Sequence, residues 1–198
     1  MIERTLVLFK PDTVLRGIVG ELLARFERTG FKIVGMKLVH ASNDLVGKHY
    51  EDNAEWMKSL GEKTKKSYEA KGVKVTEDVL TIGKRVRAQL MEFMTLAPSM
   101  AIVLEGHDVI SKVRLMVGGT APNTAAPGTI RGDYAFDSYG LADTSGRPLQ
   151  NIIHASDSKE SAVREIAVWF EPNELFSYAR VEDALLYRKV NLKVNKNG

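Results

Sequence analysis

A histidine in the last quarter of the chain has neighbours that suit phosphoryl chemistry. His154 closes the apolar run Asn151–His154, and residues 155–158 read Ala-Ser-Asp-Ser, so we expect the imidazole at a strand end near a helix N-terminus. Backbone N–H groups at such a terminus favour an anion nearby, and a neutral imidazole is a competent nucleophile toward phosphorus. Glu165 on the following helix is the candidate group to hold the tautomer of the ring. The alternative is a strand-end histidine with a satisfied hydrogen bond and no chemistry.

Cationic side chains in three other stretches could bind phosphate. Arg131 is flanked by glycines in the segment 127–133, and its guanidinium can form a bidentate fork. Arg114 on the preceding predicted helix and Thr120 in the loop are further donors. Lys10 ends a predicted strand and offers a point charge. An exposed turn arginine and a structural strand-end lysine are the alternatives for these positions.

Other polar and aromatic residues carry weaker signals. Tyr50 and the amide of Asn151 could hydrogen-bond a ribose or a reacting group. Trp56, Tyr68 and Trp169 are more typical of packing than of a cofactor site.

Several classes of site are disfavoured by residue type and spacing. The chain has no cysteine, which excludes disulfides, thiolate metal sites and Cys nucleophiles. The chain has four histidines: His40, His49, His107 and His154. Their spacing does not match a recognised set of metal ligands. Neither a P-loop nor a dinucleotide fingerprint is present. We therefore expect no metal held by protein ligands.

Composition indicates a single soluble domain over residues 1–198, with 44% hydrophobic and 27% charged residues. The longest apolar stretch, Met100–Leu104, is too short to span a bilayer. No signal-peptide core follows the first methionine, so an intracellular, cytoplasmic protein is expected. The net charge is +3, and residues 58–89 carry nine basic and four acidic side chains, a local net of +5. Solvated lysines on a helix are one explanation, and a nucleic-acid surface is the other.

The residues that could do chemistry must be placed by a small set of elements. Strands are predicted at 5–10, 32–39, 99–104, 134–136 and 151–154 from apolar runs and alternation. Helices are predicted by periodicity at about 18–29, 43–50, 86–94, 109–117 and 157–170.

The segments between these elements are predicted to be irregular. Residues 118–133 are expected to form a long Gly- and Pro-rich loop, and residues 137–149 a polar one. Asp108 and Asp157 are the expected caps of the helices that follow them. The tail after Tyr187 is expected to be loose.

The order of the elements predicts the fold class. With residues 51–89 set aside as an exposed, partly helical, Lys-rich insertion, the order is β-α-β followed by β-α-β. That order is typical of the α+β, ferredoxin-like split βαβ sandwich, an antiparallel sheet with helices packed on it. Because this fold hosts RNA-binding modules, metal-binding domains and enzymes, function must be argued from the site.

Five stretches together resemble the nucleoside diphosphate kinase family. They cover 3–12, 16–21, His49-Tyr50, 127–133 (Pro-Gly-Thr-Ile-Arg-Gly-Asp) and 151–158 (Asn-Ile-Ile-His-Ala-Ser-Asp-Ser). The last is similar to the active-site signature of the family, with Ala155 where glycine is usual. The resemblance extends over residues 1–50, 90–136 and 150–178, roughly two-thirds of the chain.

The resemblance implies an activity and a role for each matching residue. His154 would become phosphohistidine in a ping-pong transfer from a nucleoside triphosphate to a nucleoside diphosphate, with a broad base range. Glu165 would orient its imidazole, and Ser156 would support that pair. The groups implied to contact sugar, base and phosphates are Lys10, Tyr50, Leu90, Arg114, Thr120, Arg131 and Asn151.

The resemblance also implies a cofactor and partners. Mg²⁺ would be held mainly by nucleotide phosphates and water rather than by protein ligands. The partners would be nucleoside di- and triphosphates and further copies of the chain, as a hexamer, tetramer or dimer. No membrane partner is implied, and nucleic acid is not required.

Two departures from the family pattern concern the nucleotide cleft. Residues 51–89 and 137–150 are both longer than the family usually has, so we predict two insertions within one domain. Alignment puts Val86 where an aromatic residue stacks on the base, while Leu90 fits the opposing wall. Trp56 or Tyr68 could substitute for that aromatic.

Two competing functions follow from other features. A nucleic-acid-binding module would use the basic segment 58–89, but the aromatic pattern of RNA-binding ferredoxin-like sheets is lacking. A silent nucleotide-binding scaffold would not need the complete catalytic set that the chain carries.

Overall fold

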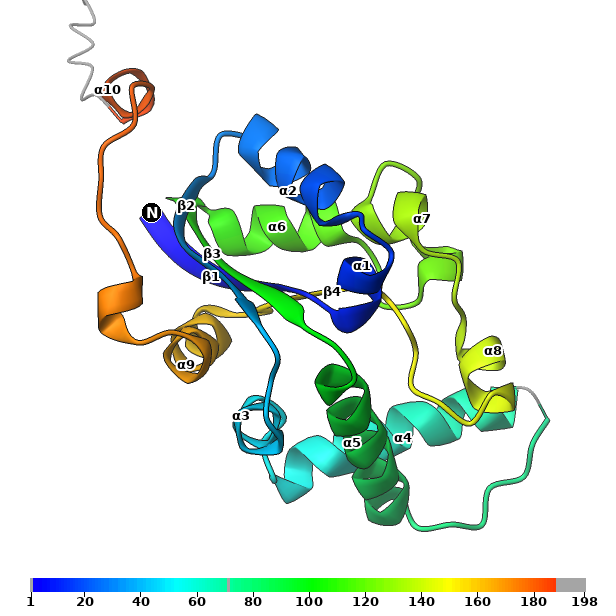
Figure 1. Ribbon diagram of the computed structural model, residues 1–198. Coiled ribbons are helices and arrows are strands. Elements are labelled where there is room, and N and C mark those ends of the chain that lie inside the picture. Colours follow the sequence, from blue (N-terminus) through cyan, green and yellow to red (C-terminus); the bar gives the residue numbers. More distant parts are fainter. Residues whose placement is uncertain (1, 71, 188–198) are drawn as a thin grey trace, which may run out of the picture.

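A four-stranded antiparallel sheet in the order β2-β3-β1-β4 organises the computed structural model, which describes residues 2–70 and 72–187 (Figure 1). Its strands are β1 (Ile2–Phe9), β2 (Lys32–Val39), β3 (Ser99–His107) and β4 (Ile153–Ala155). Helical connections join β1 to β2 and β3 to β4. The predicted ferredoxin-like α+β class is confirmed.

Helices cover both faces of the sheet and extend beyond one end of it (Figure 1). They are α1 (Pro11–Leu15), α2 (Val19–Arg28), α3 (Asn43–His49), α4 (Ala54–Ala70), α5 (Val79–Thr95), α6 (Val109–Val117), α7 (Ile130–Tyr134), α8 (Tyr139–Thr144), α9 (Lys159–Trp169) and α10 (Asp183–Leu186). Two short 3-10 turns complete the set, η1 (Pro122–Thr124) and η2 (Pro172–Glu174).

The central strand β1 separates two hydrophobic cores. Val7 and Phe9 face one side, where Phe9 stacks on Phe26 of α2 and α6 completes the layer. Leu6 and Leu8 face the other side, where α3, α5 and α9 pack. Residues alternate in this way because successive side chains of a strand point to opposite faces. Burial on both faces explains why β1 reads as a continuous apolar run.

The strand register decides where His154 points. His154 pairs directly with Leu8 across β1 and β4. Directly opposed residues of an antiparallel pair project to the same face. The imidazole therefore lies on the Leu6 and Leu8 side of the sheet, where α3 and α9 pack.

Residues 51–89 are more ordered than the sequence suggests. The predicted helix from Val86 begins earlier, at Val79, because the carboxylate of Asp78 caps it by accepting from the backbone N–H groups of residues 80 and 81. Met57 and Ile82 are buried, so the expectation of a mostly exposed stretch is wrong for the face that α4 and α5 share. Glycines in this segment are typical of helix interruptions, whereas here Gly61 and Gly83 lie where the two helices pack.

Two expectations for the segment after α6 are wrong. The predicted strand 134–136 does not form, since Tyr134 ends α7 and Phe136 is exposed. The predicted loop 118–133 contains η1 and most of α7. The Thr129 hydroxyl caps α7 by accepting from the backbone N–H of Gly132, a signal hidden among glycines and prolines.

One predicted loop contains a helix, and two predicted helix caps differ from expectation. The predicted loop 137–149 contains α8, which Ser138 caps. Helix α9 is capped by Ser158 rather than by Asp157. Asp108 precedes α6 in the left-handed region (φ 49°) without a side-chain cap, and its carboxylate lies 2.9 Å from Nδ1 of His107.

The C-terminal segment follows the outer edge of β2. The backbone N–H of Phe176 donates to the carbonyl of Val34, and the Tyr178 hydroxyl donates to the carbonyl of Ile33. The tail predicted to be loose, 188–198, falls outside the described residues. Among the helices that are described, none has the length and apolar character needed to cross a bilayer.

Two glycines allow α4 and α5 to touch. A Cβ added at Gly83 would lie 1.9 Å from the carbonyl oxygen of Met57, and one at Gly61 would lie 1.8 Å from that of Val79. Backbone at these distances cannot be displaced by a side-chain rotation, so any larger residue must separate the helices.

We expect Gly83→Ala to lower the free energy of unfolding by about 1–3 kcal/mol through overpacking. The matched control is Gly20→Ala in α2, where no atom lies within 4 Å of the added methyl. That change should be neutral or raise stability by up to about 1 kcal/mol. Urea denaturation measures both, and equal effects of the two substitutions would contradict the close contact.

Candidate active site

The predicted site residues converge on one cleft of about 550 Å³, bounded by the end of the sheet and by α4, α5 and the α8 segment. The predicted residues that line it are Lys10, Tyr50, Leu90, Arg114, Thr120, Arg131, Asn151, His154 and Glu165. Ser156 is completely buried beside them. Chain segments distant in sequence thus meet at His154.

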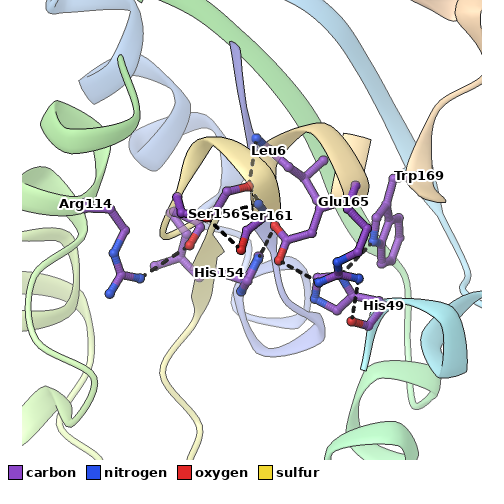
Figure 2. A network of polar contacts seen from close by, with 12 residues as sticks. Leu6, His49, Arg114, His154, Ser156, Ser161, Glu165 and Trp169 are labelled. Atoms are coloured by element: carbon purple, nitrogen blue, oxygen red, sulfur yellow. Dashed lines mark hydrogen bonds and ion pairs between the residues drawn. The ribbon is translucent and has the colours of Figure 1, made fainter. Parts of the chain in front are cut away.

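Hydrogen bonds fix the orientation of the His154 ring (Figure 2). Its Nε2 lies 2.9 Å from Oε2 of Glu165, which also accepts from the Ser156 hydroxyl at 2.6 Å. The backbone N–H of Leu6 donates to the same hydroxyl. A carboxylate can only accept, so the neutral ring carries its proton on Nε2 and keeps a lone pair on Nδ1.

The Glu165 carboxylate is held in its charged form. Burial raises its pKa, but the hydrogen bonds from His154 and Ser156 and the charge of His154 outweigh burial and hold the pKa below its usual value. A persistent anion at Nε2 favours positive charge on the imidazole. That charge develops when Nδ1 forms a bond to an electrophile.

Lys10 and Asn151 form a second polar group at the end of β1. The Lys10 ammonium donates to Oδ1 of Asn151 at 2.7 Å, and the amide of Asn151 donates to the Thr120 carbonyl at 2.9 Å. Burial, together with the positive charge of Arg131, lowers the pKa of Lys10 to about 8, against an opposing effect of Asp12. The positive charge of Lys10 is therefore only partly balanced by negative charge nearby, and an anion bound beside it would stabilise it.

An unusual backbone turn precedes β4. Ile152 has φ 57°, a conformation that a β-branched residue rarely adopts, and the N–H of Ile153 donates to the carbonyl of Asn151 at 2.7 Å, as in a γ-turn. The segment after β1 clamps this turn on both sides. The Thr13 hydroxyl donates to the Ile152 carbonyl, and the Ile152 N–H donates to the Asp12 carboxylate. The turn aims Asn151 and His154 into the same cleft.

Arg131 is less free than a phosphate-binding arginine is expected to be. Its guanidinium is buried and donates to four backbone carbonyls, those of Gly118, Gly119, Asn151 and Ile153. Burial and the neighbouring Arg114 lower its pKa to about 10. Since a guanidinium has five N–H groups, one remains for a ligand. Arg131 therefore holds the backbone around the cleft in place and also adds a positive charge to it.

Arg114 is the more accessible of the two arginines. It is half-buried on α6, and its Nη1 is 3.3 Å from the carbonyl oxygen of Ala155 (Figure 2). This contact brings a full positive charge beside His154.

The wall formed by α4 and α5 carries apolar and aromatic side chains among polar ones. The ring of Tyr50 stacks on that of Trp56 at 6.0 Å between centroids, and burial raises the Tyr50 pKa. Val86, Leu90 and Tyr68 also line the cleft. Trp56 and Tyr68, the aromatics predicted as replacements at the Val86 position, thus both line the cleft.

The α8 segment forms the opposite wall. Asp137 fixes it by accepting from Arg147 at 2.6 Å and from the backbone N–H of Gln150 at 2.7 Å. The Gln89 amide of α5 donates to the carbonyl of Gly146 and joins the two walls.

Sequence reasoning missed His49. It ends α3 and is buried, and its ring centroid lies 4.7 Å from that of His154. Ligand atoms of His49, His154 and Glu165 lie within 4.8 Å of one another, although the spacing of the histidines along the chain predicted no such cluster. The one available signal was the adjacency of His49 to Tyr50.

Basic residues of the segment 58–89 are divided between the cleft and solvent. Lys63 and Arg85 line the cleft, and Arg85 also pairs with Glu77 at 2.7 Å. At least part of this charge therefore faces the same cavity as His154 rather than a separate surface.

Comparisons with known proteins agree on one family. A family model described as nucleoside diphosphate kinase matches residues 3–70 and 80–175. A nucleoside diphosphate kinase from Pyrobaculum aerophilum is 43% identical over 88% of this chain and 98% of its own length.

Solved structures are similar over the same span. The crystal structure of an NDP kinase from Pyrobaculum aerophilum superposes with a TM-score of 0.87 at 41% identity, covering 89% of this chain and 100% of the other. The transition state mimic of the Borrelia burgdorferi enzyme, with bound vanadate and ADP, has a TM-score of 0.76 at 32% identity and covers 94% and 97%. This chain therefore belongs to the nucleoside diphosphate kinase family.

Proposed function

We propose that this protein transfers the terminal phosphate of a nucleoside triphosphate to a nucleoside diphosphate through phosphorylated His154. The observation that carries the proposal is the pairing of His154 with Glu165 and Ser156 inside the cleft. That pairing commits Nε2 and leaves the lone pair on Nδ1 for attack. Membership of the family supports the same reaction.

The transfer has two half-reactions. Nδ1 of His154 attacks the terminal phosphorus of the donor, the new N–P bond forms, and the bond to the bridging oxygen breaks so that the diphosphate leaves with the electron pair. A second diphosphate then attacks the phosphorus, and the N–P bond breaks. Glu165 stabilises the charge on the imidazole in both directions.

The cationic side chains of the cleft would stabilise the negative charge on the phosphate oxygens during transfer. Lys10, Arg114 and the free N–H of Arg131 would bind the phosphate oxygens, while Asn151 and Tyr50 would position the sugar and phosphate ends. Phosphoryl transfer depends mainly on such positioning and charge.

Mg²⁺ fits the donor set of the cleft as a nucleotide-bound ion. The side chains around the phosphate end are N–H donors, which bind phosphate oxygens and leave the metal to the phosphates and water. Bound in that way, Mg²⁺ would neutralise charge on the transferring group.

Base recognition and self-association are part of the same proposal. The apolar wall with Leu90 and Val86 would contact the base without reading its polar edge, which supports a broad base range. Met36 and Leu38 of the edge strand β2 are 49% and 58% exposed. These exposed apolar side chains support a homo-oligomer, since apolar patches on a protein surface often mark contacts with other chains.

Radiolabelled ATP with magnesium should label the wild-type protein with an acid-labile, base-stable phosphate, and His154→Ala should not be labelled. Glu165→Gln should retain the label but form it at least about tenfold more slowly, because His154 loses a hydrogen bond to a charged group, which is worth roughly 1.5–3 kcal/mol. Equal labelling of the wild type and His154→Ala would exclude the mechanism. Nucleotide binding with neither labelling nor transfer of phosphate to GDP would favour the silent scaffold.

Nucleotide affinity should fall as the pH rises from 7.5 to 9.5. The pKa of Lys10 is lowered to about 8, so the free protein loses the ammonium in this range while a bound phosphate needs it charged. The apparent Kd for a nucleoside diphosphate should therefore rise toward tenfold per pH unit above about 8. Calorimetry in two buffers checks this by detecting proton uptake on binding.

Lys10→Arg is the control for that titration. A guanidinium stays charged throughout this range, so the Kd of the variant should change little with pH even where binding is weaker overall. A flat wild-type profile would contradict the assignment of Lys10.

A further inference from the structure

His49 and Trp169 lie directly behind the nucleophile and have no part in the reaction described above. The rings of His49 and His154 meet at 88° with centroids 4.7 Å apart, and the rings of His49 and Trp169 meet at 80°. Figure 2 shows both residues on the side of Glu165 that faces away from Arg114. A buried histidine touching the reacting imidazole calls for a physical role.

One hydrogen bond defines the tautomer of His49. The indole Nε1 of Trp169 lies 3.3 Å from Nδ1 of His49. An indole N–H can only donate, so Nδ1 of His49 must accept and cannot carry a proton. The neutral ring therefore has its proton on Nε2.

The surroundings of His49 keep the ring neutral. Burial, followed by the charge of His154, lowers the pKa of His49 to about 3, and Arg164 acts in the same direction against Glu165. A neutral His49 adds no second positive charge beside the imidazole of His154. Glu165 therefore pairs with the His154 ring and the Ser156 hydroxyl, and not with a second charged histidine.

The Nε2–H group of His49 belongs to a ring that lines the cleft beside His154. No hydrogen-bond partner of this nitrogen occurs among residues 2–70 and 72–187, while His49 lines the cleft next to His154 and Glu165. A bulky ring fixed edge-to-face blocks rotation of the His154 imidazole away from Glu165.

We propose that His49, fixed by Trp169 as the Nε2–H tautomer, is a positioning residue that holds the His154 imidazole in the orientation that exposes Nδ1 for phosphoryl transfer. This inference rests on the proposed function of His154. It assigns to the His49–Trp169 pair a role that acts through ring geometry and not through contact with the transferred phosphate.

The test separates positioning from stability. His49→Gln and Trp169→Phe are compared with His107→Gln, the same type of substitution at an exposed histidine. Single-turnover phosphorylation of His154 should slow by about 10- to 100-fold in His49→Gln, since small misplacement of a reacting group has effects of that size. The Kd of the nucleotide should change less than threefold, and His107→Gln should behave as the wild type.

A spectroscopic readout tests the tautomer itself. In two-bond ¹H–¹⁵N spectra of ¹⁵N-histidine-labelled protein, His49 should show a protonated Nε2 and an unprotonated Nδ1 from pH 5 to 8. Trp169→Phe should lose this fixed pattern and give an intermediate phosphorylation rate.

Two results would overturn the proposal. One is a His49→Gln protein that is folded by circular dichroism and phosphorylates His154 at the wild-type rate. The other is a wild-type spectrum with the proton of His49 on Nδ1. Failure of the wild type to form phosphohistidine at all would instead refute the proposed function, so the two failures are distinguishable.

Discussion

The hydrogen bond between Nε2 of His154 and the Glu165 carboxylate is the interaction on which the site depends. It selects the tautomer, and it supplies the anion that balances positive charge on the ring. It forms because β4 and α9 are joined by a short connection and because Ser156 ties the same carboxylate to β1 through Leu6. The sheet register, the helix cap and the buried carboxylate thus act together on one imidazole.

The rest of the cleft is built to resist movement. The strained turn at Ile152 persists because Asp12 and Thr13 bond both its N–H and its carbonyl, and a conformation that costs free energy survives only where its surroundings over-determine it. Arg131 adds a second brace through four carbonyls. Rigid placement means that the cations need not reorganise when charge moves during the reaction.

Local pattern predicted most of the scaffold and the strand-end position of His154. The strand at 32–39 follows from alternation, the strand at 99–104 from an apolar run (it extends to His107 in the structure), and the helix at 109–117 from periodicity. A strand-end position for His154 follows from its own apolar run. The helices α7 and α8 were missed because their caps lie among glycines, prolines and polar residues. His49 and the carbonyl contacts of Arg131 could not be predicted, since both depend on long-range packing that no local spacing encodes.

The most direct test of the account is to determine which ring nitrogen of His154 carries the phosphate. The phosphoprotein, labelled with ¹⁵N-histidine and kept at alkaline pH, can be examined by ¹H–¹⁵N and ³¹P spectra. The account predicts phosphorus on Nδ1, because Glu165 occupies Nε2. Phosphorus on Nε2 would require the pairing with Glu165 to break before transfer and would contradict the account.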